Sequence, residues 1–366
     1  MIHDVRLAVR RLLRARGFTL ASVVTLGAGI AATASIFTLA SALLLRPLPY
    51  RDSARLVHLW EVREAKNYAR SEASYPDFQD WRAESRTVET FAGYSWPRVT
   101  LRGGAGAEQL QAARVTDSFF QVLGVSAALG RTLDATTPQS VLLSDGIWHR
   151  RFGADRAIVG KTVNIDGEAF GVAGVLPPSF HFAPSRGADL WLPVQPTERM
   201  RTARAMRWLN VVAKLKPGVS AAAAEQELAA IAARIAREHP DSNRGTSVQV
   251  VPLREQFLGP IRMPVLVLGC AALLVLLIAC ANVASLAIGR AARHQKDLSV
   301  LLALGARRSG IVRLLVAEAV VLSMAGAVVG VPLGMAALRA LVAAMPANMI
   351  ALLPALQTIT LDARAA

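Results

Sequence analysis

Few residues of this chain have the types and spacing that catalysis requires. Ser144, Asp145 and His149 lie close together and could form a nucleophile with an acid–base partner. Ser and Asp at the start of a predicted helix more often cap it, so we expect a structural role. The six histidines are scattered without metal-ligand spacing, which predicts no metal site. No G-x-x-x-x-G-K-[ST], G-x-S-x-G, H-E-x-x-H or C-x-x-C pattern occurs, so we expect no catalytic residue and no cofactor.

One carboxylate lies inside a long apolar run. Glu318 falls one to two helical turns inside the segment that begins at Ile311. An ionisable group at such a depth in a membrane is costly and is therefore a candidate for function. The alternative is a structural role, in which Glu318 reaches toward the interface or pairs with Arg313 or Arg307.

Small and polar residues in the apolar runs predict close helix packing. Gly326, Gly330 and Gly334 recur at four-residue spacing, the small-xxx-small pattern of helix pairs in membranes. Pro332 lies among them and is expected to kink or loosen its helix. Asn282 and Ser285, in the preceding apolar run, are predicted to form hydrogen bonds between helices.

The elements that position these residues are three predicted membrane spans, at 18–45, 263–289 and 311–344. Each is long enough for the roughly 20 apolar residues that a span needs. The formal charge of +15 is concentrated at the ends of these runs, in 1–17 and 290–313. The positive-inside rule places both basic flanks in the cytoplasm, puts 46–262 outside, and returns 345–366 to the outside. We therefore expect lipid rather than nucleic acid to account for the basic charge.

Two basic segments lie on the predicted cytoplasmic side. Residues 1–17 form an amphipathic helix that either lies in the headgroup region or serves only as a topology signal. Residues 290–310 form a compact connector, in which Leu298, Leu301 and Leu302 make an apolar stripe and Gly305 breaks the helix. A stiff connector of this kind could transmit a push from a cytosolic partner.

The segment 46–262 is predicted to be an α+β domain. Helices are expected at 75–85, 118–123, 145–152 and from Ser220 to His239, and strands at 56–60, 140–143, 208–215 and 247–251. A hairpin is expected around Asp166-Gly167. Alternating strands and helices predict a mixed sheet with helices against it.

These segments resemble the MacB/FtsX-type permeases of ABC systems over nearly the whole length. The sequence LLIACANVASLAIGRAARHQKDLSVLLALGARRSGIVRLLVAEAVVL resembles the family's second span, coupling helix and third span. YPDFQDWRAES, DSFFQVLGVSAALGRTL and VLLSDGIWHRRFGADRAIVGKTVNIDG resemble its periplasmic core domain. The subgroup most similar is the duplicated orphan permeases of Acidobacteria.

The resemblance implies an α-helical integral protein of the bacterial inner membrane with a large extracytoplasmic α+β domain of two subdomains. It implies four spans where three are present, so we expect a permease truncated before its fourth span. The partners it implies are a separate cytosolic ATPase, which alone would bind ATP, a second permease copy or half, and a periplasmic or outer-membrane protein. The implied ATPase-coupling residues are Lys296, Asp297, Leu298, Leu301, Leu302, Gly305, Ala306, Arg307 and Arg308.

Two of these coupling residues depart from the family pattern, because Asp297 stands where Glu is usual and Leu301 where Arg is usual. The function expected is that of a permease subunit, not an enzyme, which couples the ATPase to export or extraction of an antimicrobial compound, peptide or lipoprotein. The alternatives are a non-transporting regulator of a periplasmic enzyme, such as a cell-wall hydrolase, and a non-functional fragment.

Overall fold

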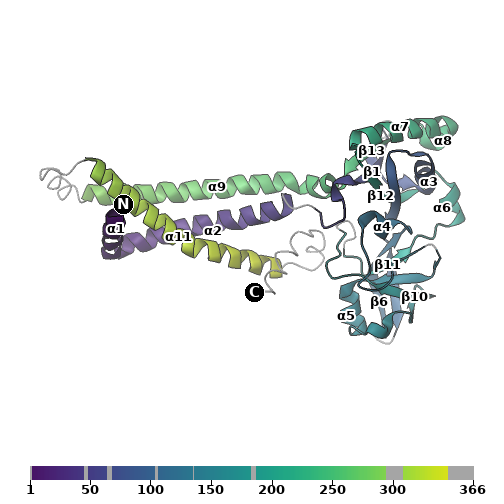
Figure 1. Cartoon of the computed structure of the whole chain (residues 1–366), viewed down its shortest axis with the longest axis horizontal. Coiled ribbons are helices and arrows are strands. Elements are labelled where there is room, and N and C mark those ends of the chain that lie inside the picture. Colours follow the sequence, from purple (N-terminus) through teal and green to yellow (C-terminus); the bar gives the residue numbers. More distant parts are fainter. Residues whose placement is uncertain are drawn as a thin grey trace. The chain divides into compact units, whose positions relative to one another are not determined.

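A computed structural model describes residues 2–44, 48–63, 68–103, 106–134, 136–182, 187–293 and 308–344. The described residues fall into two compact units, which we treat separately. The helical unit contains residues up to 44 and from 261 onward, and the α+β domain contains 48–260. Figure 1 shows long helices in the first unit and mixed strands and helices in the second.

The helical unit consists of α1 (Ile2–Arg14), α2 (Arg16–Leu44), α11 (Arg308–Ala344) and most of α9 (Leu253–Arg293). Apolar segments long enough to cross a membrane lie at Arg16–Ser41, Ile261–Arg290 and Val312–Leu341, with mean hydropathy of 1.8, 2.8 and 2.3. Three long apolar helices beside a large α+β domain confirm the predicted fold class. Helix α9 begins at Leu253, ahead of the predicted span, and α11 continues through Pro332 without a break.

One half of the α+β domain, the sheet half, is a four-stranded antiparallel sheet in the order β4–β12–β1–β13. Its strands are β1 (Leu56–Arg63), β4 (Val88–Ser95), β12 (Arg207–Leu215) and β13 (Thr246–Pro252). The short β2 (Tyr68–Ser71) and β3 (Ala73–Ser74) pair with β1 and β12. Helices α3 (Tyr75–Glu84) and α7 (Ala221–Glu238) contribute Phe78, Trp81 and Leu228 to the core, and the short α8 (Pro240–Asn243) follows α7.

The other half, the barrel half, is a closed sheet. Its neighbouring strands follow the order β11 (Leu190–Pro193), β8 (Ser140–Leu143), β10 (Glu168–Val175), β9 (Thr162–Ile165), β5 (Arg98–Gly103) and β6 (Gly106–Val115). The parallel pairing of β11 with β6 closes the ring, so its inward side chains form a core that includes Val99, Phe170 and Leu190. Strand β7 (Leu129–Gly130) and helix α5 (Asp145–Phe152) flank it.

The two halves meet at an aromatic cluster. Phe119 and Phe120, from α4 (Phe119–Leu123), are buried with Tyr94, Phe182 and Trp191. The ring centroids of Phe182 lie 5.1 Å from those of Tyr94 and Phe119, in edge-to-face geometry. The pairs Tyr94–Val115 and Ser95–Arg114 join β4 to β6. Leu253, the first residue of α9, is fully buried in the same cluster.

Local sequence signals explain several elements. Ser220 accepts a hydrogen bond from the Ala223 N–H and thereby caps α7. Asp166 and Gly167 both have positive φ, as a two-residue hairpin turn requires, and they join β9 to β10. Alternation along β1 turns Val57 and Leu59 toward the helices, and Leu56 toward the aromatic cluster.

Candidate functional site

The predicted connector lies largely outside the described residues. Its predicted coupling residues Lys296, Asp297, Leu298, Leu301, Leu302, Gly305, Ala306 and Arg307 fall there, and Arg308 is the first residue of α11. The predicted tail 345–366 also lies outside them. The helices that flank the connector, α9 and α11, are described on both sides of it.

Glu318 lies between two arginines at the end of the helical unit that flanks the connector. Its carboxylate oxygens are 3.9 Å from Arg11 Nη1 and 4.0 Å from Arg290 Nη1, and only 13% of its side chain is exposed. The expected partner Arg313 is exposed, and Arg307 is outside the described residues. The observed partners come from α1 and α9, so this charged cluster joins three helices.

The same cluster has further contacts to α1 and α2. Arg290 Nη2 donates a hydrogen bond to the Arg11 carbonyl at 3.4 Å, and its guanidinium carbon lies 5.0 Å from the Phe18 ring centroid. The Thr19 hydroxyl donates to the Leu12 carbonyl at 2.7 Å, and Leu12 itself is buried. Helix α1 is therefore packed on the helical unit, and two cations offset the cost of the partly buried carboxylate.

The small residues of α11 face α2. A Cβ added at Gly330 would lie 2.5 Å from the Gly27 carbonyl oxygen, and one at Gly334 would lie 2.5 Å from that of Ala31. The Ser35 hydroxyl also donates to the Gly334 carbonyl at 2.9 Å. These two backbones are therefore in direct contact, as small-residue packing permits.

Helix α9 touches α2 through Gly29 and Thr33. A Cβ at Gly29 would lie 3.2 Å from the Ala279 Cβ, and the Thr33 hydroxyl is 3.4 Å from the Ala272 carbonyl. Asn282 and Ser285 are exposed on α9. Among the described residues, neither side chain forms a hydrogen bond to another helix.

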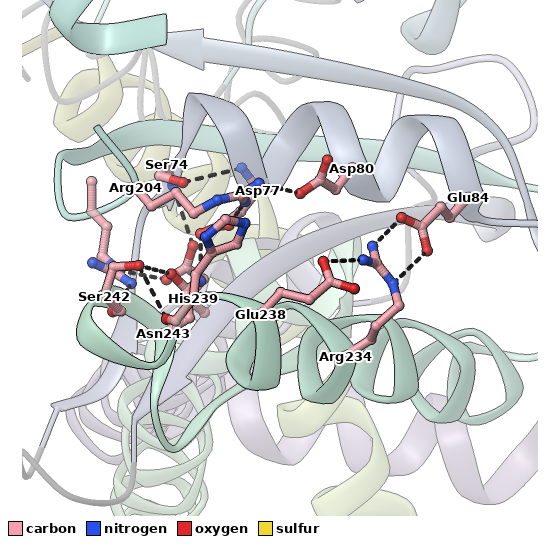
Figure 2. A network of polar contacts seen from close by, with 12 residues as sticks. Ser74, Asp77, Asp80, Glu84, Arg204, Arg234, Glu238, His239, Ser242 and Asn243 are labelled. Atoms are coloured by element: carbon pink, nitrogen blue, oxygen red, sulfur yellow. Dashed lines mark hydrogen bonds and ion pairs between the residues drawn. The ribbon is translucent and has the colours of Figure 1, made fainter. Parts of the chain in front are cut away.

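A second polar cluster lies in the sheet half and was not anticipated from the sequence. Asp77, which is 1% exposed, accepts hydrogen bonds from Asn243 Nδ2 at 2.9 Å and from Arg204 Nη1. Figure 2 shows Arg204 and Asn243 converging on Asp77, with Arg204 also paired to Asp80. The one sequence signal was the pair of aspartates at the start of α3, since nothing local identifies their partners.

Glu61, fully buried on β1, belongs to the same cluster. It accepts hydrogen bonds from Arg207 Nε and from the Ser74 N–H, the latter at 3.2 Å. Burial raises the pKa of Glu61 from 4.5 to about 7, although the Arg207 charge opposes the shift. Its partners are the Arg207 guanidinium and a backbone N–H of the same domain, which indicates a structural role.

The Ser144, Asp145 and His149 group has a structural arrangement. The Ser144 hydroxyl accepts from the Ile147 N–H at 3.2 Å and caps α5, while His149 Nδ1 lies 3.4 Å from Asp145. Within the described part of the chain, no group of three or more His, Cys, Asp or Glu side chains could hold a metal ion.

The described chain has three helices long and apolar enough to cross a membrane, and a large α+β domain between the first two along the sequence. This is the architecture of a multi-pass membrane protein. The MacB-like periplasmic core domain family matches residues 19–231, and the FtsX-like permease C-terminal family matches 269–361. The first match alone covers more than half of the chain. The chain therefore belongs to the MacB/FtsX-type ABC permeases and is a permease subunit of that class of transporter.

Three solved structures of similar domains each cover just over half of the chain. A domain of a protein described as a permease from Porphyromonas gingivalis is 17% identical, covers 56% of this chain and 91% of its own, and has a TM-score of 0.44. The periplasmic region of MacB from Actinobacillus actinomycetemcomitans is 14% identical, covers 59% of this chain and 97% of its own, and has a TM-score of 0.43. The extracellular domain of the noncanonic ABC-type transporter YknZ from Gram-positive bacteria is 16% identical, covers 54% of this chain and 99% of its own, and has a TM-score of 0.40. The comparison with curated proteins gives no match.

Proposed function

We propose that this permease subunit couples a separate cytosolic ATPase to motion of its α+β domain, and so drives export or extraction of an antimicrobial compound, peptide or lipoprotein. In the proposal, the ATPase docks on the connector between α9 and α11. A second copy of the chain, or a second permease half, completes the membrane assembly in the bacterial inner membrane. A periplasmic or outer-membrane protein receives or delivers the substrate.

The charged cluster around Glu318 is the observation that supports this proposal most. Arg290 lies three residues before the end of α9, and Glu318 lies ten residues after the start of α11. A force on the connector would therefore act on two helices that are tied to each other and to α1. Two helix ends without such contacts would move independently under the same force.

Helix α9 supports the proposal at its other end. It is one 41-residue helix, and its first residue, Leu253, is fully buried in the aromatic cluster between the two halves of the α+β domain. Helix α9 therefore links Arg290 to that cluster by continuous helical backbone, without an intervening loop.

Recovery of a bound ATPase tests the proposal. We expect the purified full chain to capture a P-loop ATPase encoded beside it, and we expect Arg307→Glu with Arg308→Glu to abolish capture. The matched control reverses two exposed charges in the α+β domain, Arg199→Glu and Arg237→Glu, and should leave capture unchanged. Failure to recover any ATPase, under conditions that preserve a known permease–ATPase pair, would contradict the proposal. Recovery of a cell-wall hydrolase through residues 46–262 would favour a regulator.

A further inference from the structure

A groove lies at the joint between the sheet half and the barrel half. Its volume is about 490 Å³, within the range of ~300–1,000 Å³ that small-molecule sites occupy. Trp208, on β12, and Met200, in α6 (Glu198–Thr202), line it from the sheet side. Arg114 on β6 and Glu168 on β10 line it from the barrel side. Arg114 is also the residue that pairs with Ser95 where the two halves join.

The lining combines aromatic faces with two unpaired charges of opposite sign. Trp96, Trp208 and Met200 provide the apolar surface. Within the described residues, neither Arg114 nor Glu168 forms an ion pair, whereas Arg150 and Arg151 nearby in the barrel half both pair with Glu108. Charges left unpaired beside an apolar groove are available to a ligand.

Trp208 adds an unused donor. Its Nε1–H is buried and has no acceptor within the described part of the chain. Buried polar groups are normally hydrogen-bonded, so an orphan donor at a groove wall requires an explanation. Because the Nε1–H is itself covered, a ligand carbonyl could supply the missing acceptor only if the indole ring turned toward the groove.

We propose that this groove binds short hydrophobic peptides with free termini. The peptide carboxylate pairs with Arg114, its ammonium group pairs with Glu168, and its apolar side chains lie on Trp96, Trp208 and Met200. Because the lining comes from both halves, an occupied groove also fixes their relative orientation. The site rests on its lining alone, so it stands whether or not an ATPase drives the chain.

Binding of trileucine to the full chain in lipid nanodiscs, without any ATPase, tests the peptide assignment by calorimetry. Three related ligands each remove one feature: N-acetyl-trileucine the ammonium group, trileucine amide the carboxylate, and triglycine the apolar side chains. We expect each to bind about ten-fold more weakly, the effect of about 1.4 kcal/mol. The proposal would be overturned if triglycine, N-acetyl-trileucine or trileucine amide bound as tightly as trileucine. Equal binding of N-acetyl-trileucine would identify a site for anionic amphiphiles instead.

Variants locate the site. Arg114→Gln should weaken trileucine binding about ten-fold and abolish the preference over the amide, and Glu168→Gln should abolish the preference over the N-acetyl peptide. The matched control, Arg237→Gln at an exposed position of α7, should change neither the trileucine affinity nor these preferences. Unchanged binding in Arg114→Gln would overturn the proposal. The ligand series uses the unmodified chain, so a misfolded variant cannot decide the result.

Discussion

The helical unit and the α+β domain differ in where they place apolar and charged side chains. The exposed large apolar side chains of the described residues all lie in the helical unit, for example Leu20, Phe37 and Leu273. The α+β domain buries its own in three clusters. An exposed apolar surface of this extent is stable in lipid, whereas water favours its burial.

This difference in the placement of apolar side chains changes the interactions that stabilise each region. Lipid tails give no hydrophobic drive for helices to associate, so the helical unit relies on direct backbone contact at its glycines and on one charged cluster. The α+β domain has a hydrophobic drive, and it accommodates two almost fully buried carboxylates, Glu61 and Asp77, by pairing them with arginines. Small changes of side-chain volume should therefore matter most in the first region, and protonation in the second.

Adding one methyl group at Gly330 should give one of the two largest effects. The added Cβ would meet the Gly27 carbonyl oxygen at 2.5 Å, so Gly330→Ala must separate α11 from α2. We expect a loss of about 1–3 kcal/mol, measured as thermal loss of helical circular dichroism from the full chain. Gly269→Ala is the control because nothing lies within 4 Å of its Cβ, and it should be neutral or stabilising. Equal melting of the two variants would contradict the observed packing.

Titration of Glu61 should produce the next effect, in the α+β domain. The pKa of Glu61 is about 7 in the folded chain and 4.5 for an ordinary glutamate, so between pH 4.5 and 7 the folded chain retains a proton that the unfolded chain loses. The stability from this group is therefore complete below pH 4.5 and is lost as pH rises through 7, by up to about 3 kcal/mol. Glu61→Gln should remove that slope.

Tryptophan fluorescence in urea measures this effect in the full chain, because all six tryptophans lie between Trp60 and Trp208. Glu227→Gln is the control. Hydrogen bonds from Thr87, Arg86 and Ser85 outweigh desolvation and lower the pKa of Glu227 to about 2, so its contribution is lost only as pH falls below 4.5. A slope between pH 4.5 and 7 that persists in Glu61→Gln would show that another group titrates there.

Removal of the Glu318 charge should have the smallest effect on stability, because its two ion pairs are long and partly exposed. Glu318→Gln should loosen α1 by about 1 kcal/mol, which corresponds to roughly five-fold faster trypsin cleavage at the exposed Arg10 and Arg14. Glu255→Gln, at the start of α9, removes an exposed carboxylate elsewhere and should leave cleavage unchanged. Unchanged cleavage in Glu318→Gln would mean that the buried Ala8 and Leu12 and the hydrogen bonds to the Arg11 and Leu12 carbonyls hold α1 in place without the ion pairs.

Local sequence signals were sufficient for many elements and insufficient for their partners. The predicted helix 145–152 has the observed bounds of α5, and Asp166-Gly167 forms the predicted turn. Such features depend on caps and turn residues within a few positions. The closure of the barrel half by β11 and β6, in contrast, joins Leu190 to Ala112, and no local pattern specifies that pairing.

The candidate site shows the same limit. The depth of Glu318 in an apolar run identified it as unusual, but its partners Arg11 and Arg290 are distant in sequence and could not be read from helical spacing. The Glu61–Arg207 pair is equally non-local, and Glu61 lies in a strand whose other residues are mostly apolar. The connector residues themselves lie outside the described residues, so their predicted role stays a prediction.

The central claim, that this permease subunit transmits work from an ATPase to its α+β domain, is tested most directly by a distance measurement. After Cys270 and Cys280, both exposed, are replaced by Ser, a spin label at Arg237→Cys reports the separation of two copies reconstituted with the captured ATPase. The account predicts that ATP binding shifts this distance by several ångströms. An unchanged distance distribution while ATP is being hydrolysed would contradict it.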